Sequence, residues 1–229
     1  MYIYGKNVAL DYLNNNEKIK KAYLNKSFND LELLNKLNKK NIAIKYVEKY
    51  ELDKLVDGMH QGIVLEVNDY EYHDLDEFIN SNFIVILDHI EDPHNFGAII
   101  RTCEAAGVGG IIIPKDRAVK VNATVIKVST GAIENVPIAE VTNLNNTIEY
   151  LKKQGYWIVG TDMEGTPYPE IDYNGKIAIV IGNEGSGMSR LVKDNCDFIA
   201  SIPMNGKTNS LNASVATGII VFEAVKQRK

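Results

Sequence analysis

Short, unbroken apolar runs constrain the fold of this chain more than any other feature. Residues 83–87 read FIVIL, residues 111–113 read III and residues 177–181 read IAIVI. A strand with one solvent-facing side alternates apolar and polar residues, so these runs indicate strands that are covered on both faces. Segments with helical spacing separate them. The alternation predicts an α/β fold with a mostly parallel sheet and helices on both sides of it.

The larger, C-terminal part of the chain supplies most of these elements. Strands are expected at 83–87, 111–113, 136–141, 156–160, 177–181 and 198–202. Helices are expected at 95–106, 124–128, 144–153 and 210–226. Glycine or proline follows several of these segments, as is usual where helices and strands end.

The first 67 residues form a smaller αβαβαβ unit. Its helices are expected at 7–13, 30–40 and 51–56, and its strands at 20–24, 42–47 and 62–67. The segment NDYEYHD (68–74) that follows is polar and acidic and has no apolar periodicity, so it is interpreted as a linker. The chain therefore divides into a small αβ domain (1–67), a linker (68–80) and a larger α/β domain (81–229).

The composition excludes several classes of protein. No apolar run approaches the roughly 18–20 residues that cross a bilayer, and the first twenty residues lack the apolar core of a signal peptide. Cys103 and Cys196 cannot form a disulfide framework. A cytoplasmic protein without a membrane partner is expected. The net charge of −5 argues weakly against nucleic-acid binding, but residues 1–66 carry 11 Lys against 9 acidic residues.

The glycine-rich segment IGNEGSGMS (181–189) directly follows a predicted strand. A phosphate-binding P-loop needs a Lys after its last glycine, and none is present. The order of Gly182, Gly185 and Gly187 reverses the dinucleotide spacing G-x-G-x-x-G, which excludes a nicotinamide dehydrogenase. Glu184 would also repel a phosphate. Two interpretations of this segment stay open: a tight strand-to-helix turn, or a loop that binds something other than phosphate.

Two further segments place polar residues where a strand ends and a helix begins. Asn95 occupies a helix-cap position, and Arg101 lies inside an otherwise apolar helix. Surface exposure could explain Arg101, and so could contact with an anion or a ribose. Ser210 and Asn212 begin the last helix, either as simple caps or as ligand contacts. The spacing of the histidines matches no metal-binding arrangement, so no metal site is expected.

Three segments, taken together and in order, resemble the three motifs of the SpoU-type RNA ribose 2′-O-methyltransferases of the SPOUT superfamily. They are DPHNFGAIIRTCEAAG (92–107), IVIGNEGSGMS (179–189) and SIPMNGKTNSLNASVATGIIVFEA (201–224). The resemblance covers residues 82–227. In addition, IYGKNVALDYL (3–13) and MHQGIVLEV (59–67) resemble the ends of a substrate-binding domain similar to ribosomal-protein RNA-binding modules. That extension is typical of the RlmB-like subgroup, which acts on a guanosine of 23S rRNA.

The resemblance implies a C-terminal trefoil knot, S-adenosylmethionine (SAM) as methyl donor, no metal, and a homodimer whose active site draws on both subunits. The implied cofactor contacts are Thr130, Gly131, Gly182, Ile202 and Leu211. The implied catalytic residues are Asn95, Arg101, Glu184, Ser210 and Asn212. SAM carries no phosphate and has a positive sulfonium, so an acid in the glycine loop fits this cofactor.

Methyl transfer to a ribose requires the 2′-oxygen to be aligned with the methyl group and its proton to be removed. A guanidinium with a pKa above about 12 is a poor base, so Arg101 is expected to bind a phosphate and stabilise the developing alkoxide. Lys115, Arg117 and Lys207 are expected among the contacts to RNA phosphates. The alternatives are a tRNA 2′-O-methyltransferase, an rRNA methyltransferase of antibiotic resistance, and a non-catalytic RNA-binding or ribosome-assembly factor.

Overall fold

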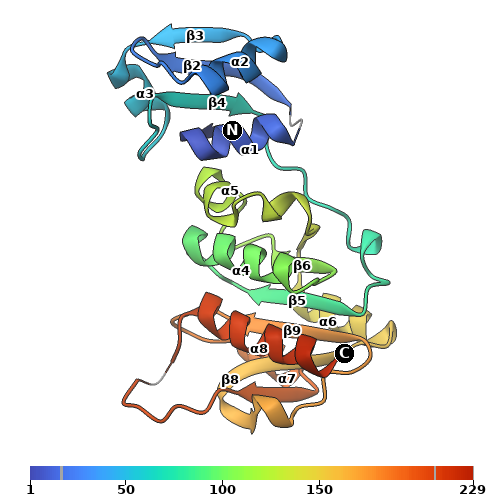
Figure 1. Cartoon of the computed structure of the whole chain (residues 1–229). Coiled ribbons are helices and arrows are strands. Elements are labelled where there is room, and N and C mark those ends of the chain that lie inside the picture. Colours follow the sequence, from blue (N-terminus) through green and yellow to red (C-terminus); the bar gives the residue numbers. More distant parts are fainter. Residues whose placement is uncertain (16–17, 209, 229) are drawn as a thin grey trace. The chain divides into compact units, whose positions relative to one another are not determined.

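The computed structural model describes residues 1–15, 18–208 and 210–228. Residue 209, inside the third SpoU-like segment (201–224), and residue 229, the end of the predicted larger domain, lie outside the described residues. The chain forms two compact units (Figure 1). One comprises Met1–Glu71 with Val121–Gly131, and the other Tyr72–Lys120 with Ala132–Lys229.

The first unit is built on a four-stranded sheet with the order β1-β4-β2-β3. The strands are β1 (Tyr2–Tyr4), β2 (Ile19–Asn25), β3 (Ile44–Val47) and β4 (Ile63–Val67). The helices are α1 (Lys6–Asn14), α2 (Leu31–Lys39) and α3 (Lys49–Leu55). β4 runs antiparallel to β1 and β2, whereas β2 and β3 are parallel. The predicted elements are confirmed, and β1 is an additional strand.

A segment from the middle of the sequence also belongs to the first unit. Helix α5 (Ala123–Ser129) packs there, with Ala123 against an apolar cluster that contains Tyr4 and Val64. The ammonium group of Lys127 lies 5.3 Å from the centroid of the Tyr4 ring, a distance at which a cation and an aromatic face attract each other. The helix ends at Thr130, whose backbone is left-handed with φ 48°.

The second unit contains a six-stranded sheet with the order β10-β8-β9-β5-β6-β7. Its strands are β5 (Phe83–Asp88), β6 (Gly110–Pro114), β7 (Ile138–Val141), β8 (Trp157–Pro167), β9 (Ile177–Gly182) and β10 (Phe198–Ser201). Each strand pairs in parallel with its neighbours. The predicted α/β class with a mostly parallel sheet is therefore confirmed. β5 and β9, the longest apolar runs, pair with each other at the centre.

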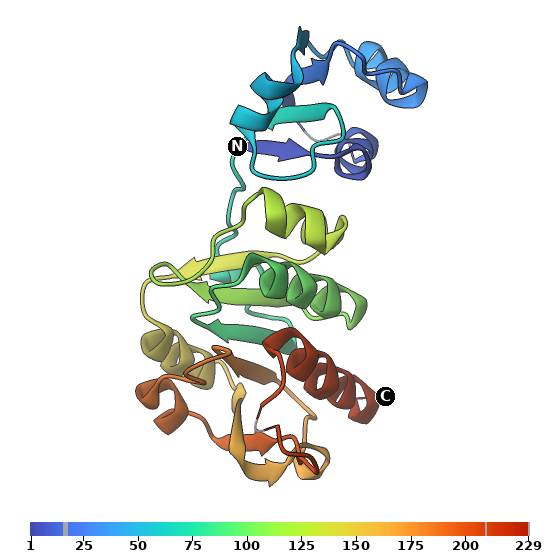
Figure 2. The same cartoon turned by 90° about the vertical axis from the view of Figure 1, so that its left-hand side faces the viewer.

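Helices cover both faces of this sheet. They are α4 (Pro93–Ala105), α6 (Leu144–Lys153), α7 (Arg190–Asp194) and α8 (Ala213–Gln227). Helices α4 and α8 lie on one face, and α6 and α7 on the other (Figure 2). Of the described helices, none is long and apolar enough to cross a membrane.

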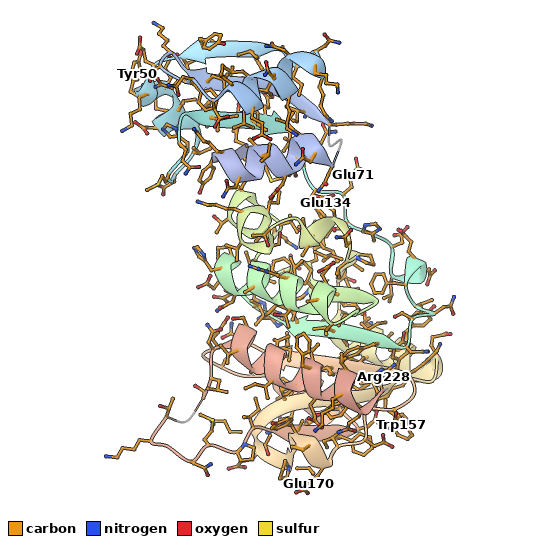
Figure 3. The ribbon with its side chains drawn as sticks, in the orientation of Figure 1. Tyr50, Glu71, Glu134, Trp157, Glu170 and Arg228 are labelled. Atoms are coloured by element: carbon orange, nitrogen blue, oxygen red, sulfur yellow. The ribbon has the colours of Figure 1, made fainter. Side chains whose placement is uncertain are left out.

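The end of α8 is fixed by Arg228 (Figure 3). Its guanidinium donates hydrogen bonds to the carbonyl oxygens of Tyr173 at 2.7 Å, Gly175 at 2.8 Å and Asn82 at 3.0 Å. The same group lies 5.2 Å from the centroid of the Phe83 ring. Burial lowers the pKa of Arg228. This arginine is therefore fully engaged in holding the C-terminal helix to the sheet.

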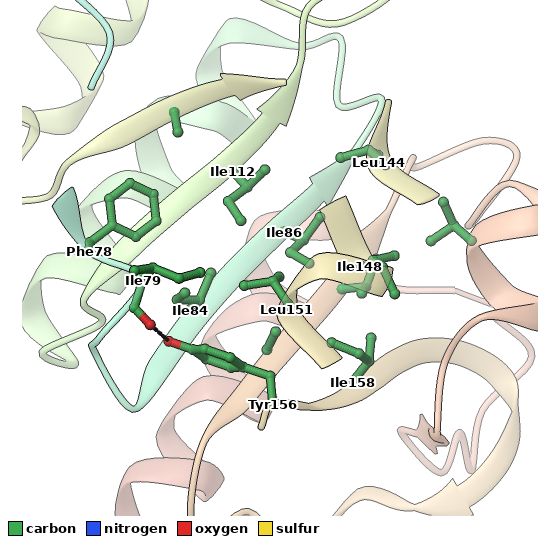
Figure 4. Close-up of a cluster of buried hydrophobic side chains, with 14 of the residues drawn as sticks. Phe78, Ile79, Ile84, Ile86, Ile112, Leu144, Ile148, Leu151, Tyr156 and Ile158 are labelled. Carbon is green, nitrogen blue, oxygen red and sulfur yellow. Dashed lines mark hydrogen bonds between the residues drawn. The ribbon is translucent and has the colours of Figure 1, made fainter. Parts of the chain in front are cut away.

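The apolar core under α6 holds the other face together (Figure 4). Ile148 and Leu151 of α6 are completely buried, as are Ile84 and Ile86 of the central strand β5. Burying each such side chain stabilises the fold by about 1.5–3 kcal/mol. The Tyr156 hydroxyl, at the edge of this core, donates to the carbonyl oxygen of Ile79 at 3.1 Å.

Candidate active site

A cavity of about 380 Å³ opens in the second unit, at the carboxyl ends of β8, β9 and β10. Open parallel sheets bind their ligands at this edge. The lining residues come from β8, the glycine loop, the segment after β10 and the start of α8: Thr161, Asp162, Met163, Ile181, Gly182, Asn183, Glu184, Gly185, Ser186, Gly187, Ala200, Ile202, Met204, Ser210, Leu211, Ala213, Ala216 and Ile220. Gly182, Ile202, Leu211, Glu184 and Ser210 were each predicted for the site.

The conformation of the glycine loop is fixed by hydrogen bonds within the protein. Asn183 and Gly187 exchange two backbone hydrogen bonds of 3.0 and 2.9 Å. The Asn183 side chain accepts from the N–H of Gly185 at 2.9 Å and donates to the carbonyl oxygen of His89 at 2.7 Å. A Cβ on Gly182 would lie 2.4 Å from the backbone nitrogen of Met188. Gly182 is therefore required by the packing of the loop, and Gly187 by its φ of 68°.

Three predicted catalytic residues, one from each motif, form a hydrogen-bonded chain. Asn95 Nδ2 donates to Glu184 Oε1 at 2.5 Å, and Asn212 Nδ2 donates to Asn95 Oδ1 at 2.8 Å. Asn95 is buried, so both ends of its amide are paired, as burial requires. The Glu184 carboxylate, which also borders the cavity, is thereby held in one orientation.

Capping of the two helices partly differs from the prediction. Asp92, not Asn95, caps α4, because its carboxylate accepts from the N–H groups of His94 at 2.6 Å and Asn95 at 3.4 Å. Asn95 lies inside the first turn and is free to serve the hydrogen-bonded chain. Asn212 does cap α8, and its Oδ1 accepts from the N–H of Ser214 at 3.0 Å. Its amide nitrogen remains for Asn95.

Arg101 stands apart from this chain. It lies six residues after Asn95 on α4, which turns its side chain by about 120° around the helix axis. It is exposed, and its guanidinium has no hydrogen-bond or ion-pair partner among the residues that the structure describes. Thr130 and Gly131 belong to the first unit, whereas the cavity lies in the second. Of the eight predicted site residues in the second unit, the structure brings seven together, all except Arg101.

Two features of the site were not predicted. Asp88, at the end of β5, is almost completely buried and accepts from the N–H of Ser189 at 2.6 Å and from His89 Nδ1 at 2.5 Å. Asp88 thereby holds the end of the glycine loop against the central strand.

The second feature is the second half of β8, which lines the cavity through Asp162. The Asp162 carboxylate forms an ion pair with Lys193 at 2.8 Å. Burial opposes ionisation of Asp162, but the hydrogen bond and charge of Lys193 together with hydrogen bonds from the backbone of Glu164 and Met163 outweigh it and keep the pKa of that carboxyl below its usual value. The polar sequence of this half-strand gave no strand signal.

The described residues contain no group of three or more His, Cys, Asp and Glu side chains that could hold a metal ion. The cavity instead combines a mainly apolar lining with a few oriented polar groups, which is the usual character of a site for an organic ligand.

Comparison with known families decides which site this is. Residues 82–222 match the SpoU rRNA Methylase family, and residues 2–73 match the family described as RNA 2′-O ribose methyltransferase substrate binding. This chain belongs to the SpoU rRNA methylase family. The residues of the SpoU match include the three hydrogen-bonded side chains of Glu184, Asn95 and Asn212 and the cavity beside them.

Individual proteins that are similar to this SpoU family member are also named as RNA methyltransferases or RNA modifying enzymes. The chain is 44% identical to YacO of Bacillus subtilis, a provisionally assigned TrmH family tRNA/rRNA methyltransferase, over 99% of this chain and 96% of YacO. An AdoMet-bound rRNA methyltransferase from Sinorhizobium meliloti aligns with a TM-score of 0.78 at 26% identity, over 98% of this chain and 86% of that one. The TrmH/SpoU tRNA modifying enzyme of A. aeolicus is 36% identical with a TM-score of 0.60, over 65% of this chain and 76% of that one.

Proposed function

We propose that this protein transfers a methyl group from SAM to a ribose 2′-hydroxyl of RNA, and that its substrate is a guanosine of 23S rRNA. The observation that carries the proposal is the hydrogen-bonded chain of Glu184, Asn95 and Asn212 beside the cavity. One residue comes from each SpoU motif. In this proposal, residues 1–67 form the domain that binds the substrate, and residues 68–80 are the linker. Residues 81–229 form the methyltransferase domain with its trefoil knot.

The cavity suits SAM by size and chemistry. Its volume of about 380 Å³ lies within the usual range of ligand pockets, about 300–1,000 Å³. The backbone N–H and C=O groups of Ile202 and Leu211 have no hydrogen-bond partner among the described residues, so they are available to the adenine or methionine part. Thr130 and Gly131 complete the contacts in the proposal. SAM supplies the methyl group on a positively charged sulfonium.

The described side chains position the RNA ribose in this scheme. Asn95 and Asn212 hold Glu184 in one orientation at the rim of the cavity, and Ser210 borders the same rim. Arg101 stabilises the developing alkoxide and binds a neighbouring phosphate, because a guanidinium offers several donors and keeps its charge. Preorganised donors of this kind supply much of the rate in many enzymes.

A homodimer accounts for the position of Arg101. Helices α4 and α8 pack side by side, and α8 leaves Val215 50% and Phe222 48% exposed. An apolar helix face of this kind is typical of a protein–protein interface. In the proposed dimer a second copy covers this face, and Arg101 contributes to an active site shared by both subunits.

The substrate class is tested by methyl transfer from labelled SAM to separate transcripts of 23S rRNA and tRNA. The rRNA assignment is supported by the S. meliloti rRNA methyltransferase, which aligns with 98% of this chain, whereas the A. aeolicus tRNA enzyme aligns with 65%. Label in 23S rRNA is expected. Label in tRNA alone would overturn the substrate, and label in neither would favour a non-catalytic RNA-binding factor.

A further inference from the structure

A second cavity lies at the same edge of the large sheet, outside the proposed SAM site. Its volume is about 320 Å³. It is lined by the ends of β5 and β6 and by the starts of α6 and α7: His89, Pro114, Asp116, Arg117, Thr142, Asn143, Leu144, Asn145, Ser189, Arg190, Leu191 and Val192. Of these residues, only Arg117 was given a role by the sequence, as one of several expected phosphate contacts, and no cavity was predicted here.

Two of the chain's four arginines, Arg117 and Arg190, line this cavity. Arginine is rare here: among 25 basic residues only Arg101, Arg117, Arg190 and Arg228 are arginines. Arg228 is occupied by three carbonyl oxygens. A planar guanidinium differs from lysine in binding phosphate through two parallel hydrogen bonds. Most basic residues of this chain are lysines, yet two arginines lie at this one cavity. They provide the donors needed to bind a phosphate there.

Both of these guanidinium groups are available to a ligand. Arg117 has no hydrogen-bond or ion-pair partner within the described part of the chain. Arg190 lies 3.7 Å from Asp194, but the Arg190 side chain is 93% exposed, and exposed pairs of this kind add little stability. Neither arginine is thus explained by the packing of the fold.

The backbone is strained at two points of the same lining. Arg117 has φ 52° and His89 has φ 61°, in the left-handed region that residues other than glycine rarely adopt. Such strain persists where the surrounding structure or a function requires it. His89 Nδ1 faces the Asp88 carboxylate, so its Nε2 is the ring nitrogen left for a ligand.

The remaining lining favours a nucleotide over a bare phosphate ion. Leu191 is 67% exposed and offers an apolar surface for a base. Asp116, Asn143 and Ser189 offer acceptors and donors for a base edge or a ribose hydroxyl. The carboxylate of Asp116 would repel an isolated phosphate ion, but it can accept a hydrogen bond from a sugar or a base amino group.

Consecutive parts of one segment line the two cavities, with residues 181–187 at the first and residues 189–192 at the second. Asp88 and His89 hold this segment through the N–H of Ser189 and the side chain of Asn183. We propose that the second cavity binds one nucleotide of the RNA substrate next to the nucleotide that is methylated, with Arg117 and Arg190 on its phosphate. This inference rests on the proposed function.

The test measures RNA affinity against salt for the full-length protein. Removing one basic side chain from a phosphate lowers the slope of log affinity against log salt by roughly 0.7–0.9. Arg117→Ala and Arg190→Ala should each reduce the slope by about that amount and weaken binding of a 23S rRNA fragment about tenfold at 0.15 M salt. Arg117→Lys keeps the charge and should retain the slope while binding the RNA more weakly than the native protein.

Lys153→Ala is the matched control, since Lys153 is exposed at the far end of α6 and outside the cavity. It removes one positive charge and should change neither slope nor affinity. Equal slopes for Arg117→Ala, Arg190→Ala and Lys153→Ala, with melting temperatures unchanged, would overturn the inference.

The two proposals fail in different ways. A native protein that methylates no RNA contradicts the proposed function, while the salt slopes still report on the second cavity. A native protein that methylates rRNA, with arginine variants that bind RNA normally, contradicts only the second site.

Discussion

Asn95 shows at the scale of single residues what the sequence could and could not reveal. Its type and its place after a strand suggested a helix cap, yet Asp92 holds that role and Asn95 joins Glu184 and Asn212. These partners are 89 and 117 positions away, so no local pattern could pair them. Resemblance to the SpoU motifs grouped them, and the structure supplied the contacts.

Replacing Asn95 by Asp should introduce a conflict that depends on pH. A carboxylate would face Glu184 across the present 2.5 Å contact, so repulsion raises the pKa of the pair above the unfolded values. Stability is then present when one carboxyl is protonated and decreases as pH rises. Asn95→Asp should therefore lose about 1–3 kcal/mol of unfolding free energy at pH 8 and less at pH 5, measured by urea denaturation. A deficit that is equal or larger at pH 5 would contradict the hydrogen-bonded chain.

Arg101 is the residue whose role depends most on the proposed chemistry. Arg101→Ala should reduce methyl transfer by at least about 100-fold and leave SAM affinity within about twofold, because this side chain does not line the SAM cavity. Single-turnover kinetics and calorimetric SAM titration measure the two effects. Arg101→Lys, which keeps the charge without the planar fork, should recover only part of the rate. Normal turnover by Arg101→Ala would remove Arg101 from the mechanism.

Among the secondary-structure elements, the buried ones were predictable and the polar or short ones were not. Strands β5 and β9 were recognisable as apolar runs because both of their faces are covered. The second half of β8 is exposed and polar, and α7 has only five residues, so neither has a periodicity that could be recognised. In the last helix, α8, the apolar residues Val215 and Phe222 are left half exposed, which helical spacing alone does not reveal.

The glycine loop provides the sharpest test of an element. A Cβ on Gly182 would meet the backbone of Met188 at 2.4 Å, whereas one on Gly185 would meet only the Asn183 side chain at 3.5 Å. Gly182→Ala should lower the free energy of unfolding by about 1–3 kcal/mol. It should also lower the melting temperature by several degrees and weaken SAM binding. Gly185→Ala, the matched control, should change the melting temperature little. Equal behaviour of the two variants in calorimetry would show that the loop does not need Gly182 for its packing.

For the whole molecule, the division into units depends on contacts that composition cannot show. The short helix α5 was predicted at 124–128 and found at Ala123–Ser129, but its packing in the first unit was not predicted. Periodicity tells which face of a helix is buried and not which element covers it. The trefoil knot is a further case, because chain threading leaves no trace in apolar spacing, and it stays a prediction of the family resemblance.

The proposed homodimer is also tested at this scale. Phe222→Glu places a charge on the exposed apolar face of α8 and should raise the dissociation constant of the dimer at least about tenfold, since burying an unpaired charge is unfavourable. Trp157→Glu is the control, because Trp157 is 55% exposed on β8, outside this face. Sedimentation velocity distinguishes the species. A native protein that is monomeric at micromolar concentration, or a Phe222→Glu variant that remains dimeric, would contradict the dimer.

The central claim is that the chain methylates a ribose 2′-oxygen of RNA. The most direct measurement is to incubate the native protein with SAM and 23S rRNA, hydrolyse the RNA with alkali and map the linkages that resist cleavage. A 2′-O-methyl group removes the hydroxyl that attacks the phosphate, so one protected linkage at a guanosine is expected, and it should be absent with Arg101→Ala. Incorporation of label with every linkage still cleaved would place the methyl group elsewhere and contradict the claim.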